Sequence, residues 1–387
     1  MIAFIAKSLV TPFESIAHPV VLVEDGVIAG VRSRDDGEIP RTATTVDLGD
    51  AVIAPGFIDI HIHGGAGHDV MRANPDGFTA LEQSLARHGV SSYFPTTVTA
   101  PLDATLAALE NLAEVIETAA VRQSSGSSRA VPLGIHLEGP FISHVRRGVH
   151  PPANLLAPTL AIFDRFWQAA RGHIRIMTIA PELEGAVEVI TEAVRRGVCV
   201  SLGHSDASLE AARAGVQAGA RHATHTFNAM RPLNQRDPGI LGEVLTNPQL
   251  TADVIADGIH LDPTIVQLFL KAKGPDAAVL ITDAISATDM PDGRYLLGEI
   301  EVEVKDGKCL ADGNLAGSVL TMDRAVRNIM QFAGWDLQQS LRLATANPAR
   351  VTGLKTRGRI EPGARADFVV LNSAGEVQRT VIGGHYS

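Results

Sequence analysis

The middle of the chain alternates between continuous apolar runs and stretches with the periodicity of amphipathic helices. Continuous apolar runs of this length are typical of parallel strands that are buried on both faces. A (β/α)8 barrel requires eight such strands with helices between them, so the sequence predicts this α/β, TIM-type fold. The runs span residues 52–63, 90–99, 131–139, 174–182, 198–206, 220–229, 251–260 and 278–286.

Helical stretches separate most of these runs. Amphipathic candidates span residues 76–89, 160–172, 186–197 and 208–219. The first, third and fourth end in a glycine, which is the residue that a helix C-cap favours at this position. The order of apolar runs and helical stretches therefore supports the barrel.

Both ends of the chain have the pattern of short antiparallel strands. Residues 1–54 contain alternating apolar runs broken by Asp-Gly and Gly-Asp, which are hairpin signals. The pattern returns near the C-terminus, so we expect a small β-sandwich domain built from residues 1–54 and 355–387. The barrel would then span residues 55–354, with a β-hairpin inserted near 294–314.

Composition and charge argue against some classes of binding partner. The chain has 387 residues, with 45% hydrophobic and 20% charged residues, which is ordinary for a globular protein. Its net charge is -10 and it has no long run of Lys or Arg, which argues against nucleic acid and anionic membrane surfaces. The N-terminus lacks the pattern of a signal peptide, and no stretch approaches the roughly 18 apolar residues of a membrane span. We therefore expect a cytoplasmic protein.

Residues with metal-ligand chemistry end most of the predicted strands. His61 and His63 end the first strand and, being two residues apart, point to the same side of it. A single histidine in this position can be a hydrogen-bonded residue of the barrel mouth, but residues of the ligand type end six of the eight predicted strands. Imidazole and carboxylate form a good donor set for zinc or iron, so we predict a metal site. The other strand ends carry Glu138, His204, His225, His260 and Asp283.

Three further residues near these strands have simpler interpretations. His136 shares a face with Glu138 but lies deeper, where it either orients a ligand or only packs. His222 lies on the opposite face of its strand from His225, so we exclude it from the site. Cys199 precedes His204 and is expected in the core.

Seven segments together resemble the N-acetylglucosamine-6-phosphate deacetylases of the amidohydrolase superfamily. Their order and spacing both agree, and the resemblance covers nearly the whole chain. It is more specific than an isolated His-x-His, which also occurs in dihydroorotases, dihydropyrimidinases and deaminases. The segments are APGFIDIHIHG, LEGPF, SLGHSDA, THTFNAM, DGIH, ITDA and LAGS.

The resemblance implies a particular set of metal ligands. Glu138, His204 and His225 would hold the first ion. His61 and His63 would hold a second one, and one- or two-ion occupancy stays open. The fourth strand offers no lysine to bridge two ions, so Glu138 would be the bridge, with Asp283 as a further ligand. Zinc or iron is expected, and manganese and cobalt suit the same donors.

The implied reaction is hydrolysis of N-acetyl-D-glucosamine 6-phosphate to D-glucosamine 6-phosphate and acetate, in amino-sugar catabolism and cell-wall recycling. A metal-activated hydroxide would attack the acetyl carbonyl. Asp283 would act as general base and then general acid, although it can instead serve only as a ligand or a helix cap. His150 would polarise the carbonyl or stabilise the oxyanion.

The substrate would be a small amino-sugar phosphate. Arg236 would grip its phosphate, by resemblance from the neighbouring subunit of a homodimer, although a surface salt bridge is the simpler role for this residue. Arg231 is interpreted as solvated. The other expected substrate contacts are His150, Asn228, His260 and the backbone of Ala229, Met230, Ala316, Gly317 and Ser318.

The sequence leaves three alternatives to this function open. The same scaffold supports deacetylation of N-acetylgalactosamine 6-phosphate, and also cyclic-amide hydrolysis or deamination. A noncatalytic scaffold protein is the third alternative. Such a protein would be expected to lose ligands, whereas Glu138, His204, His225 and Asp283 are all present.

Overall fold

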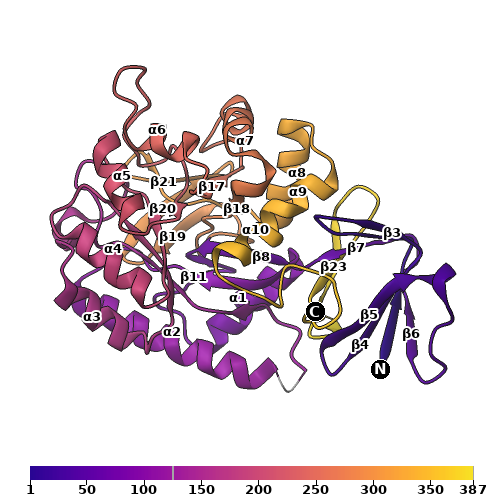
Figure 1. Cartoon of the computed structure of the whole chain (residues 1–387). Coiled ribbons are helices and arrows are strands. Elements are labelled where there is room, and N and C mark those ends of the chain that lie inside the picture. Colours follow the sequence, from indigo (N-terminus) through magenta and orange to yellow (C-terminus); the bar gives the residue numbers. More distant parts are fainter. Residues whose placement is uncertain (124–125, 387) are drawn as a thin grey trace.

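The computed structural model describes residues 1–123 and 126–386. It has a large part of mixed helices and strands and a smaller part made mainly of strands, which lies at one end of the molecule and contains both termini (Figure 1). No helix within the described ranges is long and apolar enough to span a membrane.

Eight parallel strands of the large part follow one another in chain order. Strand pairing joins β8 to β11, β13 through β16 in succession, and β17 to β18. Two parallel bridges, Thr96 to His136 and Ile62 to Ala284, join β11 to β13 and β18 back to β8. The strands are β8 (Phe57–Ile62), β11 (Val90–Pro95), β13 (Ile135–Glu138), β14 (Ile174–Ile179), β15 (Cys199–Leu202), β16 (His222–Ala223), β17 (Ala252–Ile255) and β18 (Ala278–Ile281).

Each predicted apolar run contains one of these strands, and the physical reason for the pattern is burial. Every residue of β8, β13, β17 and β18 is buried, because the strands face the interior on one side and helices on the other. A backbone hydrogen bond connects the end of β16 to β17: the Thr226 amide donates to the Asp253 carbonyl at 3.0 Å.

Helices lie around the outside of these strands (Figure 1). Several begin at a side-chain cap, such as Asn74 before α1 and Ser208 before α5. Gly89, Gly197 and Gly219 follow α1, α4 and α5 with positive φ, as predicted from the sequence. The helices are α1 (Pro75–Arg87), α2 (Leu102–Gln123), α3 (Leu160–Ala169), α4 (Ala186–Arg195), α5 (Leu209–Gln217), α6 (Gly239–Thr246), α7 (Pro263–Ala277), α8 (Met322–Ala333), α9 (Leu337–Ala344) and α10 (Ala346–Val351).

The smaller part consists of two sheets, ordered β5-β4-β1-β6 and β25-β24-β23-β7-β2-β3. The second sheet combines both chain ends, because β7 pairs antiparallel with β23. Phe4 of the first sheet packs edge-on against Phe368 of the second, with ring centroids 5.0 Å apart. The strands are β1 (Ile2–Ile5), β2 (Ser8–Val10), β3 (Ser15–Ala17), β4 (Pro19–Glu24), β5 (Val27–Ser33), β6 (Thr44–Asp47), β7 (Val52–Pro55), β23 (Phe368–Leu371), β24 (Val377–Ile382) and β25 (His385–Tyr386).

The segment predicted as an inserted hairpin forms a four-stranded antiparallel sheet. Its central turn is at Asp306 and Gly307, both with positive φ. The sheet comprises β19 (Gly293–Leu297), β20 (Ile300–Lys305), β21 (Lys308–Ala311) and β22 (Asn314–Leu315). Its apolar face packs with Val98 and Ile285, which lie beyond the ends of β11 and β18. This packing brings the insert over the carboxyl ends of the parallel strands.

Candidate active site

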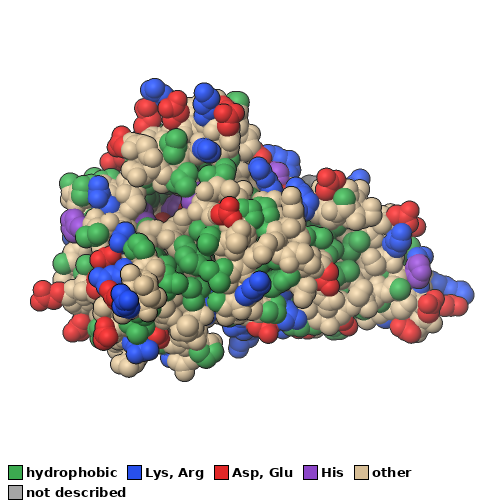
Figure 2. All heavy atoms as spheres, turned by 90° about the horizontal axis from the view of Figure 1, so that it is seen from above, with side chains coloured by type: hydrophobic (Ala, Val, Ile, Leu, Met, Phe, Trp, Pro, Cys, Tyr) green, Lys and Arg blue, Asp and Glu red, His purple; other side chains and the backbone are tan. Residues whose placement is uncertain are grey.

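A cavity of about 250 Å³ opens at the carboxyl ends of the parallel strands. Figure 2 looks onto this side of the molecule, where histidine side chains lie inside a hollow. Side chains that end or follow seven of the eight strands, together with side chains of the insert, meet in its wall. The lining residues are His63, Val98, Glu138, Gly148, Val149, His150, His204, His225, Asn228, Ala229, His260, Asp283, Leu297, Asn314, Leu315 and Gly317.

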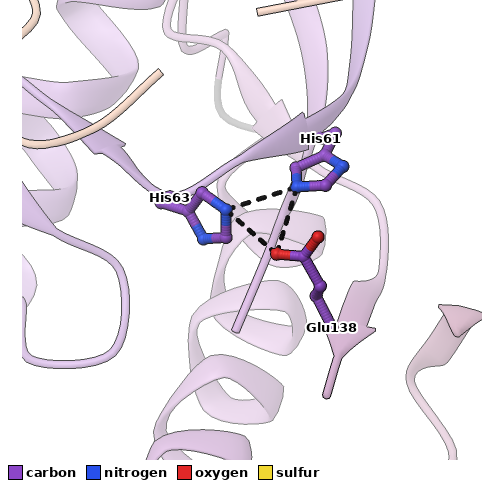
Figure 3. Close-up of side chains that lie close together, drawn as sticks. All are labelled: His61, His63 and Glu138. Carbon is purple, nitrogen blue, oxygen red and sulfur yellow. Dashed lines mark hydrogen bonds and ion pairs between the residues drawn. The ribbon is translucent and has the colours of Figure 1, made fainter. Parts of the chain in front are cut away.

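Glu138 is the central residue of a buried cluster. Its Oε2 lies 3.4 Å from His61 Nε2 and 3.3 Å from His63 Nε2 (Figure 3). Its Oε1 lies 3.3 Å from His204 Nε2 and 3.1 Å from His225 Nε2. One carboxylate therefore connects two pairs of imidazoles, and each pair together with Glu138 forms a group that can hold a metal ion.

Local backbone conformation directs these side chains into the cavity. His61 and His63 project from one face of the extended strand β8, and their Nε2 atoms are 3.2 Å apart. His204, His225 and Asp283 come just after their strands and have φ of 47°, 28° and 50°. A left-handed conformation costs a non-glycine residue about 1–3 kcal/mol, so the fold holds three site residues against local strain.

Backbone carbonyls set the proton position on two of the four histidines. His63 Nδ1 lies 3.0 Å from the Thr96 carbonyl, and His204 Nδ1 lies 3.0 Å from the Arg146 carbonyl. Because a carbonyl only accepts, Nδ1 carries a proton, and Nε2 is the nitrogen that is available to bind a cation. His204 Nε2 is 3.1 Å from His225 Nε2, a separation that requires a cation or a proton between two lone pairs. The donor set therefore fits a metal ion.

The shifted pKa values of Glu138 and His63 indicate that this cluster favours bound positive charge. Burial would raise the pKa of Glu138, but the neighbouring charge of His61 and hydrogen bonds from His204 and His225 lower it well below its ordinary value. Burial would lower the pKa of His63, but hydrogen bonds to Asp283 and Glu138 raise it to about 10. Without a metal, protons supply the positive charge that this carboxylate requires.

Asp283 lies beside the first pair of histidines. Its Oδ1 is 3.2 Å from His63 Nε2 and 3.5 Å from His61 Nε2. Burial would raise the pKa of Asp283, but the hydrogen bond from His63 and the charges of His61 and His63 lower it to about 2. An ionised carboxylate therefore faces the cavity next to the cluster.

His150 reaches the same cavity from the loop that follows β13. Its Nε2 lies 3.9 Å from Glu138 Oε2, and its side chain is buried. Burial, together with the neighbouring charge of His204, holds the pKa of His150 well below its ordinary value. His150 is therefore a neutral imidazole at neutral pH.

Four residues that the sequence indicated for substrate binding line the cavity: Asn228, Ala229, His260 and Gly317. The Nδ2 of Asn228 is buried and has no hydrogen-bond partner among the described residues, so it is a free donor. His260 Nδ1 lies 2.7 Å from Asp257 Oδ2, an ion-pair geometry that orients the imidazole.

Four residues that were expected to contact the substrate lie outside the cavity wall. Met230, Ala316 and Ser318 are buried behind it, and the Ser318 amide donates to the Asp283 carbonyl at 2.8 Å. Arg236 is exposed in the loop before α6 and does not line this cavity. Arg231, which we interpreted as solvated, forms an ion pair with Asp206.

Two further histidines support the cluster from behind. His136 lies beneath His61, with ring centroids 4.6 Å apart, and its Nε2 is 2.8 Å from Thr178 Oγ1. His222 is outside the cluster, as expected, and lies 3.0 Å from the Asp253 carboxylate, which also accepts the His225 amide. These contacts fix the strands from which the site residues project.

Sequence reasoning missed part of the cavity wall. Leu297, Asn314 and Leu315 come from the insert, whose position over the strands depends on long-range packing. Val98, Gly148 and Val149 have no distinctive chemistry of their own. Gly148 and Val149 directly precede His150 in the sequence, and Val98 lies near the end of a predicted strand.

Comparisons with known proteins agree with this geometry. A family model described as the amidohydrolase family matches residues 52–386. An N-acetylglucosamine-6-phosphate deacetylase from Bos taurus is 41% identical over 352 residues, covering 87% of this chain and 84% of the relative. An N-acetylgalactosamine-6-phosphate deacetylase from Escherichia coli O157:H7 is 38% identical over 364 residues, covering 94% and 93%.

A solved structure gives the same result for the fold. The N-acetyl-D-glucosamine-6-phosphate deacetylase from Mycobacterium smegmatis superposes with a TM-score of 0.92 at 32% identity. The superposition covers 100% of this chain and 100% of that one. The resemblance inferred from the seven sequence segments is thereby confirmed.

Proposed function

This chain belongs to the amidohydrolase family, and from that membership we propose that it hydrolyses N-acetyl-D-glucosamine 6-phosphate to D-glucosamine 6-phosphate and acetate. The observation that carries the proposal is the Glu138 carboxylate shared between two pairs of histidines, with the ionised Asp283 beside it. Such a reaction belongs to amino-sugar catabolism and cell-wall recycling, and we assign the protein to the cytoplasm.

We propose that the cluster holds one or two divalent ions, zinc or iron first. Glu138, His204 and His225 would bind one ion, and His61 and His63 would bind the second, with Glu138 as the bridge and Asp283 as an additional ligand. A bound ion of this kind lowers the pKa of water and polarises a carbonyl group.

Asp283 and His150 would carry the proton and charge changes of the reaction. Asp283 would take a proton from the attacking water as its oxygen bonds to the acetyl carbon. It would then return that proton to the amide nitrogen as the C–N bond breaks, which leaves acetate and a free amine. The neutral His150 would donate a hydrogen bond to the acetyl oxygen, where negative charge develops.

Phosphate recognition would use donors on both sides of a homodimer. Asn228 offers a free buried donor, and His260 lines the same cavity. We propose that Arg236 completes the phosphate site of a second copy, because it is exposed and does not line the cavity of its own chain. The backbone of Ala229, Met230, Ala316, Gly317 and Ser318 would shape the sugar and phosphate pockets.

We further interpret the eight parallel strands and their helices as a (β/α)8 barrel. The barrel would span residues 55–354, and the terminal sheets would form a β-sandwich domain of residues 1–54 and 355–387. Because the first strand of the barrel follows directly from β7, the small domain would anchor the strand that carries His61 and His63.

N-acetylgalactosamine 6-phosphate is the second candidate substrate, because the Escherichia coli relative carries that name. An acetate-release assay on both phosphorylated sugars and on free N-acetylglucosamine, with metal content measured on the same preparation, tests the proposal. We expect the highest kcat/KM on N-acetylglucosamine 6-phosphate. Equal rates on the free sugar would contradict a phosphate site.

A further inference from the structure

Thr99 lies directly behind His150. It follows β11 in a buried segment, and its side chain is almost completely enclosed. Its backbone nitrogen is 3.2 Å from His150 Nδ1, and its Oγ1 is 2.8 Å from the same atom. The backbone N–H and the side-chain hydroxyl of Thr99 therefore both contact Nδ1 of His150.

The backbone contact decides which nitrogen of His150 carries the proton. A backbone N–H can only donate, so His150 Nδ1 must accept at this contact. The hydroxyl of Thr99 alone would allow either arrangement, because it can donate or accept. A neutral imidazole carries one proton, which must then be on Nε2. That nitrogen faces the cavity, 3.9 Å from Glu138 Oε2.

We propose that Thr99 is a positioning residue that fixes His150 as the tautomer with its proton on Nε2. The inference rests on the proposed role of His150, because only this tautomer presents an N–H to the acetyl oxygen of a substrate. The opposite tautomer would present a lone pair to that oxygen. Thr99 therefore acts on the reaction through His150 and touches no substrate atom.

Packing around this pair excludes a side chain at position 139. A Cβ on Gly139 would lie 2.1 Å from Thr99 Oγ1 and 3.5 Å from His150 Nδ1. Gly139 also has a φ of 71°, which side-chain-bearing residues rarely adopt. Because position 139 has no side chain, the Thr99 hydroxyl can approach the His150 imidazole. The contact between Thr99 and His150 therefore depends on the residue that directly follows Glu138.

The test combines Thr99→Val, which removes the hydroxyl at nearly equal volume, with Thr99→Ser, which keeps it. Thr105→Val is the matched control, because Thr105 is also buried and its hydroxyl faces only carbonyls of its own helix start. Nitrogen-15 NMR of histidine-labelled, metal-loaded protein reports the tautomer, and His150→Gln assigns the His150 signals.

We expect wild type and Thr99→Ser to show the proton on Nε2 of His150. Thr99→Val keeps the backbone N–H, so the His150 proton should stay on Nε2, but loss of the hydroxyl contact that holds the imidazole should lower kcat about 3- to 10-fold with little change in KM, the effect of losing one hydrogen bond. Thr105→Val should match wild type in both measurements.

Two results separate this inference from the proposed function. A wild-type signal with the proton on Nδ1, or an unchanged kcat in Thr99→Val, would overturn the role of Thr99 while deacetylation stands. A wild-type protein without deacetylase activity would refute the proposed function, and the NMR result on the tautomer would still be valid.

Discussion

Replacing Glu138 with glutamine removes the charge on which the whole cluster depends. The variant keeps the shape of the side chain, so the four histidines keep their places. In the wild-type protein each carboxylate oxygen lies 3.1–3.4 Å from two imidazole nitrogens. Glutamine offers one neutral oxygen and one NH2 group, so one histidine pair faces a weaker acceptor and the other faces a donor that cannot bind a cation.

The size of the effect follows from burial. Glu138 is 2% exposed, so solvent does not screen the loss. Removing one partner of a buried ionic contact costs about 3–5 kcal/mol, which corresponds to a metal affinity about 10²- to 10⁴-fold weaker. We expect Glu138→Gln to lose at least one ion on dialysis and to lose deacetylation in proportion.

The assay is metal stoichiometry by mass spectrometry across a chelator titration, together with acetate release. Glu82→Gln is the control, since Glu82 is equally buried but pairs with Arg122 at 2.8 Å and does not line the cavity. The control should lower thermal stability and leave metal content unchanged. A Glu138→Gln protein with wild-type metal content and turnover within a few-fold would refute the reasoning.

Three more predictions address the proton carrier, the phosphate site and a structural histidine. Asp283→Asn should lower kcat/KM by about 100- to 10,000-fold while metal stays bound, and robust turnover by this variant would exclude the acid/base role. Arg236→Ala should raise KM for the phosphorylated sugar about 10- to 100-fold but leave the unphosphorylated sugar unaffected, and equal effects on both would remove it from the phosphate site. His88 contacts Asp289 and Asp323; burial would lower its pKa, but hydrogen bonds to these carboxylates raise it to about 9. The stability that this raised pKa contributes is complete below the ordinary value of 6.5 and is lost as pH rises through about 9, so His88→Gln should flatten the fall of Tm over that range; an unchanged pH profile would contradict the assignment.

The sequence predicted the ligand set because two simple rules apply to it. Alternation along a strand places His61 and His63 on one face, and the carboxyl ends of parallel strands meet at one edge. These rules placed Glu138, His204 and His225 at strand ends without any contact information, and the family resemblance grouped the three as ligands of one ion. The geometry agrees with each of these placements.

The rest of the site depends on contacts that spacing does not encode. The insert was predicted as a hairpin, yet Asn314 and Leu315 pair back onto β21 and reach the cavity because the whole sheet packs on Val98 and Ile285. The sequence also did not predict the left-handed backbone conformation of His204, His225 and Asp283, because neither residue type requires it.

The loop that contains Arg146 and His150 links the proposed metal site to the proposed carbonyl donor. The carbonyl of Arg146 orients the imidazole of His204, and the Arg146 side chain pairs with Asp206 at 2.8 Å, two residues beyond that ligand. The same loop continues to His150, whose amide donates to the Arg147 carbonyl. A displacement of this loop would therefore turn the proposed ligand His204 and move the proposed carbonyl donor His150 together. If both roles hold, substitutions in the loop should change metal affinity and turnover in parallel.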